Sequence, residues 1–159
     1  MNSISFIRNL FLLSLVVSLL TVFLGANPAQ AAEKDCGKEL NQEYKAFLKK
    51  LRAQNFKTGA ASGSGKAAKA MTKWLQKVHK EVVAHENAHK KASGKWGGTI
   101  KYKNYTWWNI PYAVAGCHIP KHGRPLEVSL KAALAPKEPS KWDLENAKKI
   151  RALLKKKKK

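Results

Sequence analysis

The side chains best suited to chemistry are His85, Glu86 and His89, which together form an HExxH pattern. Two histidines four positions apart on a helix project from the same face, so both imidazoles can bind one zinc ion. The glutamate beside them can take a proton from a water molecule bound to that ion. The pattern therefore predicts a zinc-dependent hydrolytic site, with Zn²⁺ as its cofactor and Glu86 as its catalytic base.

The third zinc ligand is open at this stage. Four residues that follow the HExxH pattern could supply it, namely Cys117, His118, His122 and Glu127. A thiolate from Cys117 would suit zinc, but Cys117 cannot bind the ion while it is joined to Cys36 in a disulfide. We expect the disulfide to form and His118 to be the third ligand, with Cys117 as its rival.

The N-terminal segment predicts export from the cytoplasm. Arg8 gives it a positive start, residues 10–24 are an apolar run, and Ala29-Gln30-Ala31 offers a small-x-small cleavage site. The apolar run is shorter than the roughly 18 to 20 residues that span a bilayer, which disfavours the alternative of an uncleaved anchor. We therefore expect a signal peptide over residues 1–31, cleavage after Ala31, and a secreted or periplasmic protein. That oxidising setting favours the disulfide named above.

Three helices are expected in the rest of the chain. Apolar residues recur at three- and four-residue steps over residues 38–54, which indicates an amphipathic helix. A longer helix over residues 66–93 carries the HExxH pattern. Ser140 and Asp143 form a start signal for a last helix over residues 142–154.

A hairpin is expected between the second and third of these helices. Residues 99–119 are rich in aromatic and β-branched side chains, which favour strands. Trp107 and Trp108 fall within this stretch and are weak candidates for lining a substrate groove near the metal, although aromatic side chains on a small sheet are more often part of the core. The helices and the hairpin together predict an α+β fold.

Three stretches resemble the SprA-related family of metalloprotease catalytic domains. They are HENAHKKASG at 85–94, YAVAG at 112–116 and ALAPKEPSKWDLENA at 133–147, which stand in the same order as in that family. The resemblance covers residues 78–154. It implies a zincin-like domain in which His85 and His89 bind zinc and Glu86 is the general base.

The chain departs from that family at two places. The family continues as YAVGGEV, so a glutamate is expected where this chain has Cys117. Its longer acidic segment before ALAP is reduced here to HIPKHGRPLEVSLKA. Both departures affect which residue could be the third zinc ligand. The ALAPKEPS segment, residues 133–140, is expected to be a structural corner outside the active site, because its prolines favour an extended path.

The expected organisation follows from these elements and from the resemblance. It consists of a signal peptide (1–31), an N-terminal amphipathic helix with a Gly/Ser linker (32–65), a zincin-like metalloprotease domain (66–154) with a long HExxH helix, a small antiparallel sheet and flanking helices, and a poly-Lys tail (155–159).

Charge leaves two functions in competition. The chain carries 31 Lys and Arg residues against 10 Asp and Glu residues, for a net charge of +21. The favoured function is a secreted zinc-dependent metallopeptidase with a peptide or protein substrate. The alternative is a secreted cationic protein that binds anionic cell-envelope polymers or membranes and has a degenerate or structural metal site. Nucleic acid is not an expected partner, because the lysines are dispersed rather than interleaved with aromatic residues.

Overall fold

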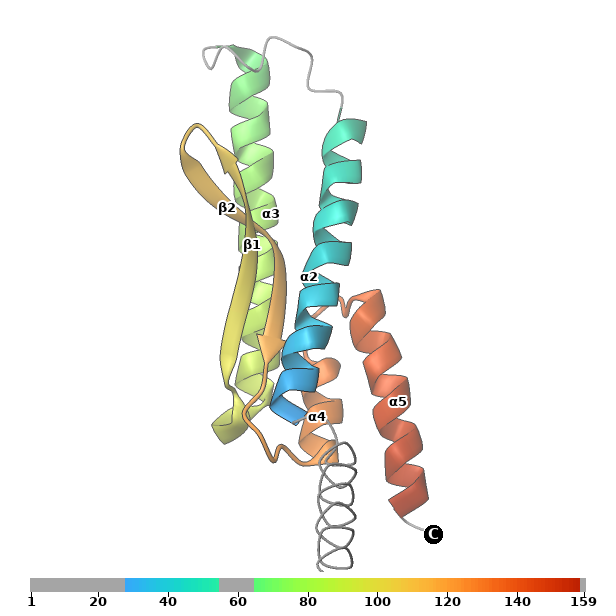
Figure 1. Ribbon diagram of the computed structural model, residues 1–159. Coiled ribbons are helices and arrows are strands. Elements are labelled where there is room, and N and C mark those ends of the chain that lie inside the picture. The colour runs from blue at the N-terminus through green and yellow to red at the C-terminus, as the bar shows by residue number, and fades with distance from the viewer. Residues whose placement is uncertain (1–27, 55–64, 158–159) are drawn as a thin grey trace, which may run out of the picture.

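The structure is a computed structural model that describes residues 28–54 and 65–157. The predicted signal peptide, up to residue 27, and the linker over residues 59–64 lie outside the described residues. Over the described ranges the fold is α+β, with helices and one antiparallel sheet (Figure 1). Its elements are α2 (Pro28–Ala53), α3 (Lys66–Ala92), the short 3₁₀ turn η2 (Gly94–Trp96), β1 (Thr99–Trp107), β2 (Ile110–Ile119), α4 (Leu126–Ala133) and α5 (Lys141–Lys157).

The helices differ from expectation mainly at their ends. α3 agrees with the predicted helix to within one residue. α2 starts at Pro28, ahead of the predicted start at residue 38, and proline is well tolerated at the first position of a helix. α5 continues through Lys157 into the expected tail. The eight-residue helix α4 was not predicted, because one short apolar stretch carries little periodicity.

The predicted hairpin is confirmed. β1 pairs with β2 in antiparallel register, with Tyr102 opposite Gly116 and a register shift after Lys103. Trp108 and Asn109 form the two-residue turn, and both have positive φ angles (53° and 56°), as a tight hairpin turn of this twist requires.

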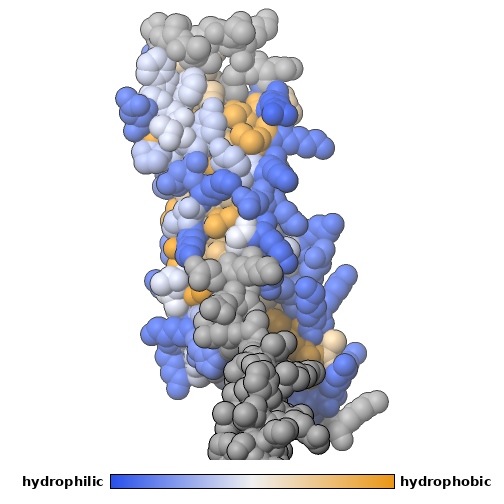
Figure 2. All heavy atoms as spheres, viewed as in Figure 1, coloured by the Kyte–Doolittle hydropathy of each residue, from blue (hydrophilic) through white to orange (hydrophobic). Residues whose placement is uncertain are grey.

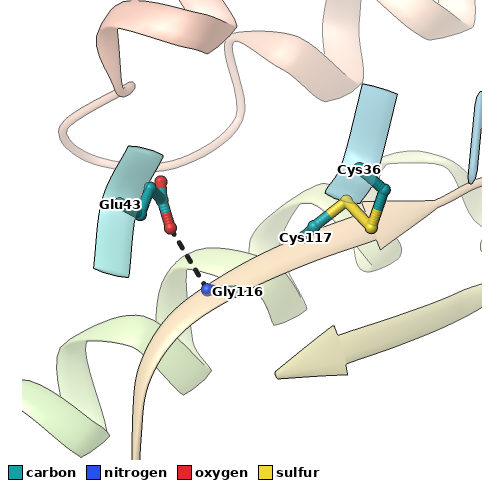
Figure 3. Close-up of a disulfide and its surroundings, with 4 residues drawn as sticks. All are labelled: Cys36, Glu43, Gly116 and Cys117. Atoms are coloured by element: carbon teal, nitrogen blue, oxygen red, sulfur yellow. Dashed lines mark hydrogen bonds between the residues drawn. A yellow bond between two sulfur atoms is a disulfide. The ribbon is translucent and has the colours of Figure 1, made fainter. Parts of the chain in front are cut away.

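β2 is the buried centre of the fold. Its residues from Tyr112 to Cys117 are all buried, whereas no residue of β1 is. Both α2 and α3 pack against β2 (Figure 1). Two side chains of α2 also bond to it directly: Cys36 forms a disulfide with Cys117, and Glu43 Oε2 accepts a hydrogen bond of 3.2 Å from the backbone N–H of Gly116 (Figure 3).

The hydrophobic core joins these same three elements. Phe47 of α2, Leu75 of α3 and Val114 of β2 belong to one buried cluster, together with Met71 and Tyr112. Phe47 also stacks on the ring of Trp74 at a centroid distance of 5.6 Å. α2 is therefore an integral layer of the domain, although it precedes the stretch that resembles the SprA-related family.

The face seen in Figure 2 is mostly hydrophilic, with some apolar patches. Figure 2 shows hydrophilic side chains over most of the visible face, including the side formed by α5. Within residues 28–54 and 65–157, no helix combines the length and the apolar character needed to cross a membrane.

The disulfide should contribute strongly to stability. It links residues 81 positions apart, and closing a loop of this size stabilises a fold by about 4 to 5 kcal/mol in the chain-entropy model. We expect a variant with both Cys36→Ser and Cys117→Ser to lose about that much free energy of unfolding in urea denaturation followed by tryptophan fluorescence. The wild-type chain in reducing buffer is the matched control and should behave like the variant. Equal stability of the oxidised wild type and the variant would contradict the expectation.

Candidate metal centre

Three side chains from two distant helices converge at one point. His85 and His89 lie on α3, one turn apart, and Asp143 lies in the first turn of α5. His85 Nε2 lies 3.1 Å from Asp143 Oδ2, and His89 Nε2 lies 3.2 Å from Asp143 Oδ1. The two Nε2 atoms are 3.0 Å apart. One donor atom from each residue lies within 4.8 Å of the other two, which is close enough for all three to hold one metal ion.

Asp143 is oriented by the cap of α5. Its Oδ2 accepts hydrogen bonds of 2.8 Å from both the backbone N–H and the hydroxyl of Ser140, and its own N–H donates to Ser140 Oγ at 3.1 Å. This reciprocal pair is a capping box, in which the first and fourth residues satisfy each other's backbone groups. The start signal seen in the sequence therefore also aims a carboxylate at the two histidines.

His89 is oriented by α4. Its Nδ1 donates a hydrogen bond of 2.8 Å to the backbone oxygen of Ala132. α4 is held at this distance by Arg124, which donates to Ser93 Oγ at the end of α3 (2.9 Å) and to Ser129 Oγ within α4 (3.0 Å). Because Nδ1 carries the proton, Nε2 is the nitrogen that a neutral His89 offers to a metal.

The electrostatics of the three side chains favour a positive charge among them. In a neutral His89 the Nε2 lone pair would face the Asp143 carboxylate, and this arrangement is stable only with a proton or a cation between the two. Burial lowers the pKa of His89, but the hydrogen bond and charge of Asp143 and the Ala132 carbonyl raise it above its ordinary value. Burial raises the pKa of Asp143, but hydrogen bonds from His85, His89 and Ser140 hold it well below its ordinary range.

Glu86 lies beside this group in a tight space. Its side chain is only 3% exposed, and its Oε2 is buried with no hydrogen-bond partner among the described residues. It packs directly over Gly116 of β2, where a Cβ atom would come within 2.4 Å of Glu86 Cγ. Burial raises the pKa of Glu86 to about 7, against the opposing effect of the two histidines. A carboxyl group in this condition can take up and release a proton near neutral pH.

α2 adds two further carboxyl groups. Burial and the neighbouring Glu43, Glu86 and Asp143 raise the pKa of Glu39 to about 9, and burial raises the pKa of Glu43. Neither residue was predicted from the sequence. Their spacing of four places them on one side of an amphipathic helix, but nothing in the sequence indicates that this side faces the HExxH helix.

A cleft of about 780 Å³ opens beside the group. Its walls are α2 and α3, Val114 of β2 contributes to its lining, and His85 and Glu86 reach it from α3. The segment between α4 and α5 also lines it, through Pro136, Lys137, Glu138 and Ser140. The expectation that the ALAPKEPS segment lies outside the active site stays a prediction. Part of the segment, which bends at residues 136–138, lines the cleft and leads into the cap that orients Asp143.

The structure places the other expected site residues elsewhere. Cys117 is joined to Cys36 in the disulfide. The His118 ring is parallel to that of His89 at 6.3 Å, but its Nε2 donates to the backbone oxygen of Gly97, and His118 is not among the three converging residues.

Neither of the two expected groove tryptophans lines the cleft. Trp107 donates from Nε1 to Thr72 Oγ1 near the start of α3, and Trp108 is in the hairpin turn and half exposed. Trp74 is the tryptophan in the cleft wall.

A comparison with family models, curated proteins and solved structures finds no match to this chain. The resemblance to the SprA-related family therefore stays a prediction that rests on the three motifs.

The contact between His89 and Asp143 predicts a pH dependence for the metal-free protein. The raised pKa of His89 means that this contact stabilises the fold fully below pH about 6.5, and that the contribution is lost as pH rises through the folded-state pKa. With a chelator present, we expect Asp143→Asn to lower the free energy of unfolding by about 3 kcal/mol at about pH 5, and by clearly less at about pH 9.

Ser140→Ala is the matched control, because it weakens the cap without removing the carboxylate. It should cost about 1 kcal/mol at both pH values. Chemical denaturation at the two pH values measures both variants. An effect of Asp143→Asn that does not change with pH would contradict the expectation.

Proposed function

We propose that the protein is a zinc-dependent metallopeptidase, in which His85, His89 and Asp143 hold the ion and Glu86 is the general base. The observation that carries the proposal is the convergence of two imidazole nitrogens and a carboxylate beside a buried glutamate whose Oε2 has no partner. Asp143 replaces His118 in the proposed ligand set, because His118 bonds to Gly97 instead.

The donor set fits zinc. Two histidine nitrogens and one carboxylate oxygen are a ligand set that catalytic zinc sites use, and such sites keep a further position open. His89 already has its outer nitrogen bound to Ala132, and Asp143 is held by Ser140, so two of the three ligands have the supporting bonds that metal ligands need. A cation would also relieve the repulsion between the His89 lone pair and the carboxylate.

In the proposed reaction, the ion and the protein have separate roles. A zinc ion held there would polarise a peptide carbonyl and make water a nucleophile near neutral pH. Glu86 accepts the proton of the attacking water at its free oxygen and returns it to the leaving amine. In the metal-free chain, burial raises the pKa of Glu86 to about 7. The cleft between α2 and α3 holds the substrate against His85 and Glu86.

Zinc binding tests the ligand set. We expect the purified chain to bind one zinc ion, and His85→Ala and Asp143→Ala to lower the affinity by more than about a hundredfold, which exceeds the usual effect of an outer partner. Metal content by mass spectrometry and competition with a chelator measure this. His118→Ala should leave the affinity unchanged, as should Glu145→Ala, an exposed acid on the same helix as Asp143. Loss of zinc in His118→Ala but not in Asp143→Ala would restore His118 as the third ligand.

Peptide hydrolysis tests the catalytic base. Glu86→Gln should keep zinc and the fold but lower the rate of peptide hydrolysis by about a hundredfold to ten-thousandfold, because it removes proton transfer alone. Cleavage of an unstructured protein substrate by the zinc-loaded chain measures the rate. Glu127→Gln, at an exposed position, is the control and should be as active as the wild type. A zinc-loaded wild-type chain with no hydrolysis above that of Glu86→Gln would overturn the proposed reaction.

A further inference from the structure

The cleft has an apolar part that leads away from the metal-binding group. α2 and α3 run in opposite directions beside each other (Figure 1), and residues of both line the cleft. On α3 the lining includes Trp74, Val78 and Val82 before it reaches His85. These residues follow one another at helical spacing, and at 1.5 Å per residue the row is about 16 Å long. Phe47 of α2 lies across from it, stacked on Trp74.

The cleft is also the acidic part of a basic protein. Of the chain's 10 Asp and Glu residues, four line the cleft, whereas Lys50 and Lys137 are the lining residues among 31 Lys and Arg. The four acids are Glu43, Glu81, Glu86 and Glu138. The acids come from α2, α3 and the segment before α5. Burial raises the pKa of Glu43 and Glu86, whereas Glu81 and Glu138 are exposed, and Glu81 Oε1 lies 3.8 Å from Lys77 Nζ.

The apolar row and the acidic residues of the cleft together favour a ligand that has both an apolar and a basic side chain. We propose that the cleft binds peptide segments in which a bulky apolar side chain, placed against Val78 and Trp74, is adjacent to a basic side chain placed near Glu81 and Glu138. The apolar side chain gains by leaving water for the Val78–Trp74 wall. The basic side chain is attracted to the exposed carboxylates of Glu81 and Glu138, which line the cleft.

This inference deepens the proposed function and rests on it for the cleavage step. Peptide binding to the cleft does not require that step. α2 supplies one wall of the cleft and Glu43, although it lies outside the stretch that carries the HExxH pattern. The disulfide and the Glu43–Gly116 hydrogen bond hold that wall to β2 (Figure 3). Substrate choice would thus be set by α2 as well as by α3.

The experiment measures peptide binding to the full chain carrying Glu86→Gln, so that no peptide is cleaved. Fluorescently labelled hexapeptides vary one position among Ala, Leu and Phe, and its neighbour between Lys and Glu, and fluorescence anisotropy gives each affinity with zinc and with a chelator. We expect Leu and Phe to bind about tenfold more tightly than Ala, since side chains that differ by a few methylenes are distinguished to this degree. Lys should be preferred to Glu by about fivefold.

Variants in the cleft should remove each preference separately. Val78→Asp should abolish the preference for Leu and Phe, and the milder Val78→Ala should weaken it with less risk to folding. Ile110→Asp is the matched control, because Ile110 is exposed in the hairpin outside the cleft, and it should have no effect. Glu81→Gln combined with Glu138→Gln should remove the preference for Lys, whereas Glu145→Gln, on the exposed side of α5, should not.

The outcomes separate this inference from the proposed function. Peptide preference without zinc binding or hydrolysis would keep the inference and overturn the peptidase. Zinc-dependent hydrolysis with no preference for apolar or basic side chains would overturn the inference alone. A preference for Glu over Lys, or equal effects of Val78→Asp and Ile110→Asp on peptide affinity, would also overturn it.

Discussion

The Asp143 carboxylate connects the C-terminal helix α5 to the HExxH helix α3. Asp143 accepts from Ser140 as part of the cap of α5, and it also lies within hydrogen-bond distance of both histidines of α3. The start of α5 is therefore fixed by the same group that completes the candidate metal centre. The position of α4 depends on the same histidine, because the Ala132 carbonyl accepts a hydrogen bond from His89 Nδ1. A change at Asp143 would disturb helix capping, helix packing and the electrostatics of the centre together.

Gly116 of β2 places a second constraint on the site, at Glu86. Gly116 is contacted from both α2 and α3, with Glu43 bonded to its N–H and Glu86 packed against it. A larger residue at position 116 would collide with Glu86, so the buried position of Glu86 requires a glycine at this point of β2. The carboxyl groups of Glu39, Glu43 and Glu86 lie close together, and burial raises the pKa of all three, so a strongly basic protein gathers at this one place carboxyl groups whose neutral form is favoured.

Local patterns in the sequence predict much of the fold but only part of the site. Strand-favouring composition is enough for the hairpin, and periodicity is enough for α3, because both depend on neighbouring residues. The HExxH pattern is local in the same sense. Asp143 was assigned to the capping box alone, and a helix start gives no information on which distant helix it meets. α4 and the cleft wall from α2 depend on how elements pack, and no residue type in either of them signals that position.

The disulfide described above has a consequence for damage to the chain. Cys36 and Cys117 are 81 positions apart, so every peptide bond between α2 and β2 lies within the loop they close. A single cut in that loop would leave both pieces joined through sulfur, with α2 still seated on β2. A cut by a protease between α2 and α3 would therefore not release a wall of the cleft. Only a nick together with reduction would let the N-terminal piece leave.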